Sequence, residues 1–147
     1  MTKKQSGFTL VELLVVIGIL AVLTAVVLVA VNPGRQLAQA RDTQRRADVN
    51  TIITSISAYM ADPENNGQLP AGLVTLCTVG AHDIGTGGLD LAAVVAPTYV
   101  ADIPMDPSGG TAADTGYDVC VAEATARRIT VFAPNTEIAS TTISVTR

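Results

Sequence analysis

Apolar residues dominate the N-terminal part of the chain. From Leu13 to Val31 the chain runs for 19 residues in which only Gly18 and Thr24 depart from strongly apolar character. A helix of that length rises about 28 Å, close to the roughly 30 Å hydrocarbon thickness of a bilayer. A secretory signal peptide would have a shorter apolar region followed by a small-x-small cleavage site, and the stretch VLVAVNPG contains no convincing one. We therefore expect a retained membrane segment.

A second helical segment is expected after an interruption at Asn32-Pro33-Gly34, because proline removes one helical hydrogen bond. It should stop near Asp62, since Pro63 and then Asn65-Asn66-Gly67 are strong breakers. Its second half has an apolar stripe at three- and four-residue steps, formed by Val49, Ile52, Ile53, Ile56, Tyr59 and Met60. Its first half has no comparable stripe. There we expect the charged side chains to be solvated or to face a partner: Arg41, Asp42, Arg45, Arg46 and Asp48.

The rest of the chain predicts a loop-rich middle and a small sheet. Residues 70–116 have a loop pattern with two short apolar patches, LVTLC and LDLAAVV, each of which predicts a turn or two of helix. Two strands are expected in YDVCVA and RITVFA, and a third in the tail IASTTISVTR. Alternation in the first strand sets Cys120 on the face opposite Tyr117, Val119 and Val121. The predicted fold class is α+β: a long N-terminal α-helix, its apolar first half protruding, packed on a small antiparallel β-sheet.

Composition and charge exclude several partners. The net charge of −4 gives no basic footprint for duplex DNA. Aromatic residues make up 3% of the chain and tryptophan is absent, which argues against a stacking platform for single-stranded nucleic acid. Arg45-Arg46 and Arg127-Arg128 are better interpreted as a solvated or intersubunit charge face than as DNA contacts. A nucleic-acid partner is therefore not expected.

Catalytic chemistry has no support in the sequence. His82 is the single histidine and lies in a Gly-rich stretch, where we expect an exposed loop residue rather than a base. The chain has no nucleophile elbow, no paired metal-ligand spacing and no phosphate-binding loop. Neither an enzyme nor a cofactor is expected.

The lysines and the cysteines bear on which side of a membrane each part lies. Lys3 and Lys4 favour a cytoplasmic N-terminus, although arginines also follow the apolar run, so the charge count alone is equivocal. Cys77 and Cys120 can form a disulfide if their side is oxidising, and two separate buried thiols are the alternative. Closing the 44-residue loop would stabilise the fold by about 4 kcal/mol in the chain-entropy model.

One carboxylate, Glu12, lies at the start of the apolar run. A charge at the centre of a membrane helix costs roughly 2.5–3.5 kcal/mol on insertion scales. Glu12 is either an interfacial residue that stays wet or one whose cationic partner comes from another copy of the chain. Cleavage after Gly7 would create that cation, because it releases an α-amine on Phe8. Such a pair would set the register of a helical bundle, although desolvation limits its net gain.

The string KKQSGFTLVELL, residues 3–14, resembles the class III signal of the type IV pilin family, which the pseudopilins of type II secretion share. The resemblance implies that a membrane aspartyl peptidase cleaves after Gly7 and N-methylates Phe8. It also implies that Glu12 helps to recruit subunits into a helical filament, and that the α+β fold is pilin-like.

Two later stretches are similar to the same family. ARDTQRRADVNTIITSISAYMADPENNGQLP resembles the helix and exit segment of bacterial pilins and the major pseudopilin, and IPMDPSGG with GYDVCV is similar to a stretch of major-pseudopilin-like proteins. Major pseudopilins often hold calcium in a sheet loop, and four aspartates could be ligands here: Asp102, Asp106, Asp114 and Asp118. Aspartates in turns usually bond their own backbone, so no metal ligand is assigned.

The resemblance implies four parts: a leader (1–7), a transmembrane and polymerisation helix (8–31), an amphipathic second half (32–62) and a globular region of loops and sheet (63–147). The expected function is a structural subunit of a type IV pilus-like filament. A major pseudopilin of type II secretion and a monomeric membrane-anchored binding protein are the alternatives. Expected partners are other copies of the chain, prepilin peptidase and inner-membrane assembly machinery. The subunit would cross the cytoplasmic membrane once, N-terminus inside, before joining an extracellular filament.

Overall fold

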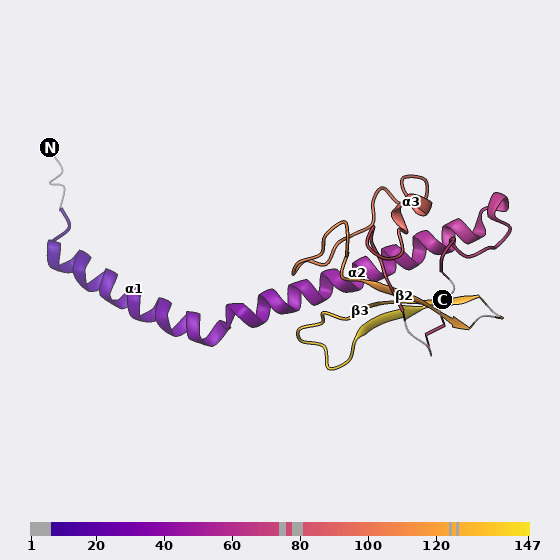
Figure 1. Ribbon diagram of the computed structural model, residues 1–147. Helices are drawn as coiled ribbons and strands as arrows, with labels where there is room; N and C mark the ends of the chain where they lie inside the picture. The colour runs from indigo at the N-terminus through magenta and orange to yellow at the C-terminus, as the bar shows by residue number, and fades with distance from the viewer. Residues whose placement is uncertain (1–6, 74–75, 78–80, 124, 126) are drawn as a thin grey trace. The chain divides into compact units, whose positions relative to one another are not determined.

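The computed structural model of the protein describes residues 7–73, 76–77, 81–123, 125 and 127–147. The chain divides into two compact units, Met1–Leu37 and Ala38–Arg147. The described elements are an apolar N-terminal helix, a second long helix and an antiparallel sheet (Figure 1). The α+β fold class predicted from the sequence is confirmed.

Helix α1 of the first unit spans Leu10–Val31 and is apolar over almost its whole surface. None of its residues is buried, and it is the one helix among the described residues that is long and apolar enough to cross a membrane. It ends at Asn32, whose φ of 44° is left-handed, and helix α2 begins at Pro33. The interruption expected around Asn32 is therefore present.

Helix α2 spans Pro33–Ala61 and supplies the second unit with its long helix. A short 3₁₀ helix, η1, follows at Pro63–Asn65, and the Asp62 side chain caps it by accepting the N–H of Glu64. The chain then turns through Asn66, which is also left-handed. The predicted end of the helix near Asp62 is confirmed.

The sheet has four antiparallel strands in the order β1-β2-β3-β4: His82–Asp83, Asp118–Glu123, Arg128–Ala133 and Ile143–Thr146. Strands β2, β3 and β4 lie in the three stretches that the sequence predicts. Strand β1 was missed because a two-residue strand carries no alternation. The expectation that His82 lies in a loop was wrong, since its backbone pairs with Val119 of β2.

One hydrophobic core joins α2 to the sheet. The predicted helix stripe is buried, with Val49, Ile52, Ile53 and Ile56 fully so and Tyr59 and Met60 partly so. The sheet contributes its inward-facing alternate residues, together with Tyr117 just before β2; they are Val119, Val121, Ile129, Val131, Ala133 and Ile143. The alternation read from the sequence thus places the correct face of each strand against the core.

The two apolar patches of the middle region differ in outcome. LDLAAVV contains a short helix, α3, at Ala92–Val95, as expected. In LVTLC, residues 74–75 lie outside the described residues, and Leu76 forms an isolated parallel bridge with Val121. The helical interpretation is therefore wrong at Leu76, which pairs with the edge of β2.

Candidate functional site

The residues around the expected processing point form the start of helix α1. Gly7, Phe8 and Thr9 precede the helix in non-helical backbone, and the Phe8 side chain is 83% exposed. Nothing lies within 4 Å of the position a Cβ on Gly7 would occupy. The Gly7–Phe8 peptide bond is thus accessible in the described chain.

Thr9 and Glu12 form the local contacts of this end of the helix. The Thr9 hydroxyl oxygen accepts the backbone N–H of Glu12 at 3.3 Å and lies 3.5 Å from the Glu12 carboxylate, to which it can donate. This is the Thr-x-x-Glu capping pattern, and it fixes the first helical turn one residue after Phe8. A carboxylate in the first turn also complements the positive end of the helix dipole. No ion pair to Glu12 occurs within the part of the chain that the structure describes.

Helix α1 has no polar face to direct toward water. A helix that is apolar all round is stable only in a membrane or among other apolar helices. Helix α1, with the accessible Gly7–Phe8 peptide bond before it, has the features of a segment that can lie in a bilayer and can also pack into a helical bundle.

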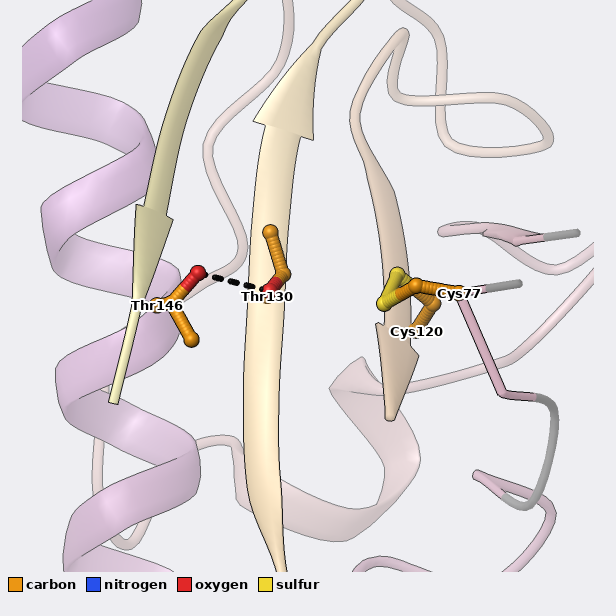
Figure 2. Close-up of a disulfide and its surroundings, with 4 residues drawn as sticks. All are labelled: Cys77, Cys120, Thr130 and Thr146. Atoms are coloured by element: carbon orange, nitrogen blue, oxygen red, sulfur yellow. Dashed lines mark hydrogen bonds between the residues drawn. A yellow bond between two sulfur atoms is a disulfide. The ribbon is translucent and has the colours of Figure 1, made fainter. Parts of the chain in front are cut away.

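Cys77 and Cys120 are joined by a disulfide, which excludes the alternative of two separate thiols (Figure 2). Cys120 is buried on β2, whereas Cys77 is exposed and donates its backbone N–H to Val121 at 2.9 Å. Figure 2 shows Thr130 on the strand next to Cys120 and Thr146 on the strand beyond it. The hydroxyls of the two threonines lie 2.7 Å apart. The bond lies on the sheet face opposite the core, as the alternation predicts.

Arg45 is the centre of a buried charge cluster, and the sequence-based expectation that it is solvated was wrong. Its side chain has no exposed surface, and it donates to the Asp106 carboxylate at 2.6 and 3.1 Å. It also donates to Asp42 at 2.8 Å and to Glu137 at 2.9 Å. The hydrogen bonds that Arg45 donates to Asp106 raise the pKa of Arg45 above its ordinary value and outweigh burial, which lowers it. Arg45-Arg46 is therefore not a paired surface charge.

Asp42 was also expected in solvent and is instead buried. It accepts three consecutive backbone N–H groups, those of Glu137, Ile138 and Ala139, at 2.8–3.0 Å. Burial alone would raise the pKa of the Asp42 carboxyl, but these three bonds and Arg45 together hold it well below its usual range. Hydrogen bonds from Arg41 and then Arg45 lower the pKa of Glu137 to about 2.

The four aspartates considered as calcium ligands are not gathered at one point. Asp106 binds Arg45, Asp102 accepts the N–H of Ile103, and Asp114 accepts the N–H of Gly116. Asp118 faces Asp83 on the neighbouring strand, and burial together with that contact raises its pKa to about 6. In the described ranges no three His, Cys, Asp or Glu side chains come together as a possible metal site.

Sequence reasoning therefore found the N-terminal segment and the disulfide, and missed the Arg45 cluster. The side chains that bury Arg45 lie 61 and 92 residues further along the chain. No local pattern around Arg45 signals them.

A family model for the prokaryotic N-terminal methylation motif matches residues 2–28. Searches of curated proteins and of solved structures each found no match. The match covers Gly7, Phe8 and Glu12 and most of α1, which is the segment with the accessible bond and the uniformly apolar surface. The chain carries, at the head of a pilin-like α+β fold, the class III prepilin signal that is characteristic of type IV pilins and pseudopilins.

Proposed function

We propose that the protein is a structural, non-catalytic subunit of a type IV pilus-like extracellular filament, processed by prepilin peptidase and assembled through helix α1. The observation that carries this proposal is the methylation motif at residues 2–28, which covers most of a 22-residue helix with no buried residue. An exposed apolar surface of that extent needs lipid before assembly and neighbouring helices afterwards.

In this proposal, residues 1–7 are removed as a leader and the new terminus at Phe8 is N-methylated. The subunit crosses the cytoplasmic membrane once, with its N-terminus inside, and waits there for assembly machinery. Glu12 then receives the α-amine of Phe8 from a neighbouring copy. The pair offsets the cost of each charge in an apolar bundle, and removal of one partner would leave the other unpaired.

The remaining parts have separate roles. Residues 8–31 polymerise, residues 32–62 extend the helix into the globular part, and residues 63–147 form the filament surface. The partners are other copies of this chain, prepilin peptidase and inner-membrane assembly proteins. The work of the assembled fibre is mechanical and adhesive.

The function is tested by replacing Glu12 and counting filaments. Glu12→Ala is expected to leave the protein in the membrane while sharply reducing the filaments sheared from cells, because the neighbour's amine loses its partner. Glu64→Ala, which removes an exposed carboxylate outside α1, is the matched control and should assemble normally. A normal filament yield from Glu12→Ala would contradict the assembly mechanism. It would mean that Glu12 is a hydrated residue at the membrane interface.

A major pseudopilin of type II secretion is the second candidate, favoured by the IPMDPSGG and GYDVCV stretches around Asp106 and Tyr117. It would share processing after Gly7 but build a short fibre. Electron microscopy of producing cells, with an antibody against the sheet, distinguishes the two functions. Long labelled surface filaments indicate a pilus, and their absence indicates a pseudopilin. A monomeric membrane-anchored binding protein would retain residues 1–7 and stay monomeric in detergent.

A further inference from the structure

Three segments that are distant in sequence meet at the Arg45 cluster. They are the middle of α2, the turn at residues 106–110 and the loop at residues 134–142 between β3 and β4. The disulfide joins Cys77 to β2 and so ties down neither the turn nor the loop. Contacts other than covalent ones must therefore hold these two segments on the helix.

The apolar anchorage of the loop against the core is a single small side chain, that of the partly buried Ala139. Pro134, Asn135 and residues 140–142 are exposed, and the Ile138 side chain is 40% exposed. Its attachment to α2 consists of the three backbone N–H groups that Asp42 accepts and of the Glu137 carboxylate, which binds Arg41 and Arg45. Charge-assisted hydrogen bonds of this kind are about twice as strong as neutral ones.

Five charged groups at the junction take part in this attachment, and Asp114, whose carboxylate accepts the N–H of Gly116, lines the cavity beside them. Arg41, Asp42 and Arg45 come from α2, Asp106 comes from the turn and Glu137 comes from the loop, and the Ser108 hydroxyl bonds both Arg45 and Glu137. Tyr117, which directly precedes β2, also interacts electrostatically with Asp106 and Arg45. Three carboxylates thus surround a fully buried guanidinium, and each is ionised at neutral pH because its pKa lies below the ordinary value.

We propose that Asp42, Arg45 and Glu137 form a charged clasp that holds the loop 134–142 on helix α2, and that the loop detaches, with the sheet left intact, when a clasp carboxylate is lost or neutralised. The sheet can remain because β3 and β4 keep their own backbone pairing and the buried Ile143. The clasp acts within residues 38–147 and operates whether or not the chain assembles.

Asp42 is the residue to change, because removal of Arg45 would leave buried carboxylates unpaired and endanger the whole fold. Asp42→Ala removes the acceptor but leaves the three N–H groups of residues 137–139 converging on a carboxylate-sized space beside Arg45. Such a space is a ready receptor for a small anion. Formate is therefore the probe for it. Gln44→Met is the matched control, since Gln44 neighbours Arg45 in sequence and is exposed.

The measurement is hydrogen–deuterium exchange of the full chain in detergent micelles. In Asp42→Ala, amides of residues 134–142 should exchange roughly tenfold faster or more, because each lost bond was to a charged group. Amides of β2 and β3 should keep their wild-type rates, and Gln44→Met should match wild type throughout. Sodium formate, compared with sodium chloride at the same concentration, should slow the exchange of residues 137–139 in Asp42→Ala alone.

Three results would overturn the clasp. Unchanged exchange of residues 134–142 in Asp42→Ala would mean that the loop is held by something else. Faster exchange throughout the sheet would make the cluster part of the global fold rather than a local fastening. Faster loop exchange that formate does not slow more than chloride would show that the three N–H groups do not hold the loop by binding an anion.

Discussion

The Cys77–Cys120 disulfide closes a loop that contains most of the middle region, and its removal should cost much of the stability of the second unit. The two cysteines are 43 residues apart in sequence. In the chain-entropy model a cross-link of that span restricts the unfolded chain enough to stabilise the fold by about 4 kcal/mol. A domain of this size is stable by only about 5–15 kcal/mol in total, so the loss would be a large fraction.

The perturbation is the double variant Cys77→Ala with Cys120→Ala, and the assay is urea unfolding of the full chain in detergent micelles. Near-ultraviolet circular dichroism reports the tyrosines, Tyr59, Tyr99 and Tyr117, all of which lie outside α1. With a urea dependence of about 1–2 kcal/mol per molar for a small domain, the unfolding midpoint should fall by roughly 2–4 M.

Cys77→Ala alone is the matched control, because it breaks the bond while leaving the buried Cys120 sulfur in place on β2. It should unfold at nearly the same urea concentration as the double variant, as should wild type kept reduced. If the double variant unfolds at the midpoint of the oxidised protein, the disulfide does not stabilise the fold in the way described. If the single variant stays near wild type while the double variant falls, packing of the sulfur rather than loop closure carries the effect.

Two further predictions concern polar contacts at and beside strand β2. Burial and the facing Asp83 raise the pKa of Asp118 to about 6, above its value of about 3.9 in the unfolded chain, so the folded state binds more protons between these values. Stability should therefore fall as pH rises from about 4 to 6, and Asp83→Asn should flatten that dependence in urea unfolding at stepped pH; an unchanged slope would contradict the pairing. Tyr117, which is fully buried, donates its hydroxyl to Asp48 at 2.6 Å. Tyr117→Phe should lower the free energy of unfolding by about 1.5–3 kcal/mol, as expected for a hydrogen bond to a charged group, and an unchanged urea midpoint would show that water replaces the bond fully.

The fold was predictable from the sequence where its signals are local. The helix stripe from Val49 to Met60 repeats every three or four residues, and β2 and β3 alternate, so each pattern reports the face that is buried. The N-terminal segment was predictable for the same reason, since Gly7, Phe8 and Glu12 lie within six consecutive residues.

What the sequence did not predict depends on contacts between distant segments. Arg45 and Asp42 lie in a helix segment whose many charged residues are typical of a solvent-exposed surface. They are buried because Asp106 and Glu137, which are distant in sequence, contact them in the folded chain. Leu76 likewise pairs with the sheet through a bridge to Val121 rather than continuing a helix. Charged side chains can be buried when side chains of opposite charge pair with them. Local periodicity does not report pairing between segments that are distant in sequence.

The central claim is that the chain is cut after Gly7 and enters filaments through the new terminus. Mass spectrometry of the protein from sheared filaments tests it most directly. The first residue should be Phe8 carrying one added methyl group on its α-amine, with residues 1–7 absent. Assembled protein that still begins at Met1 would contradict the account.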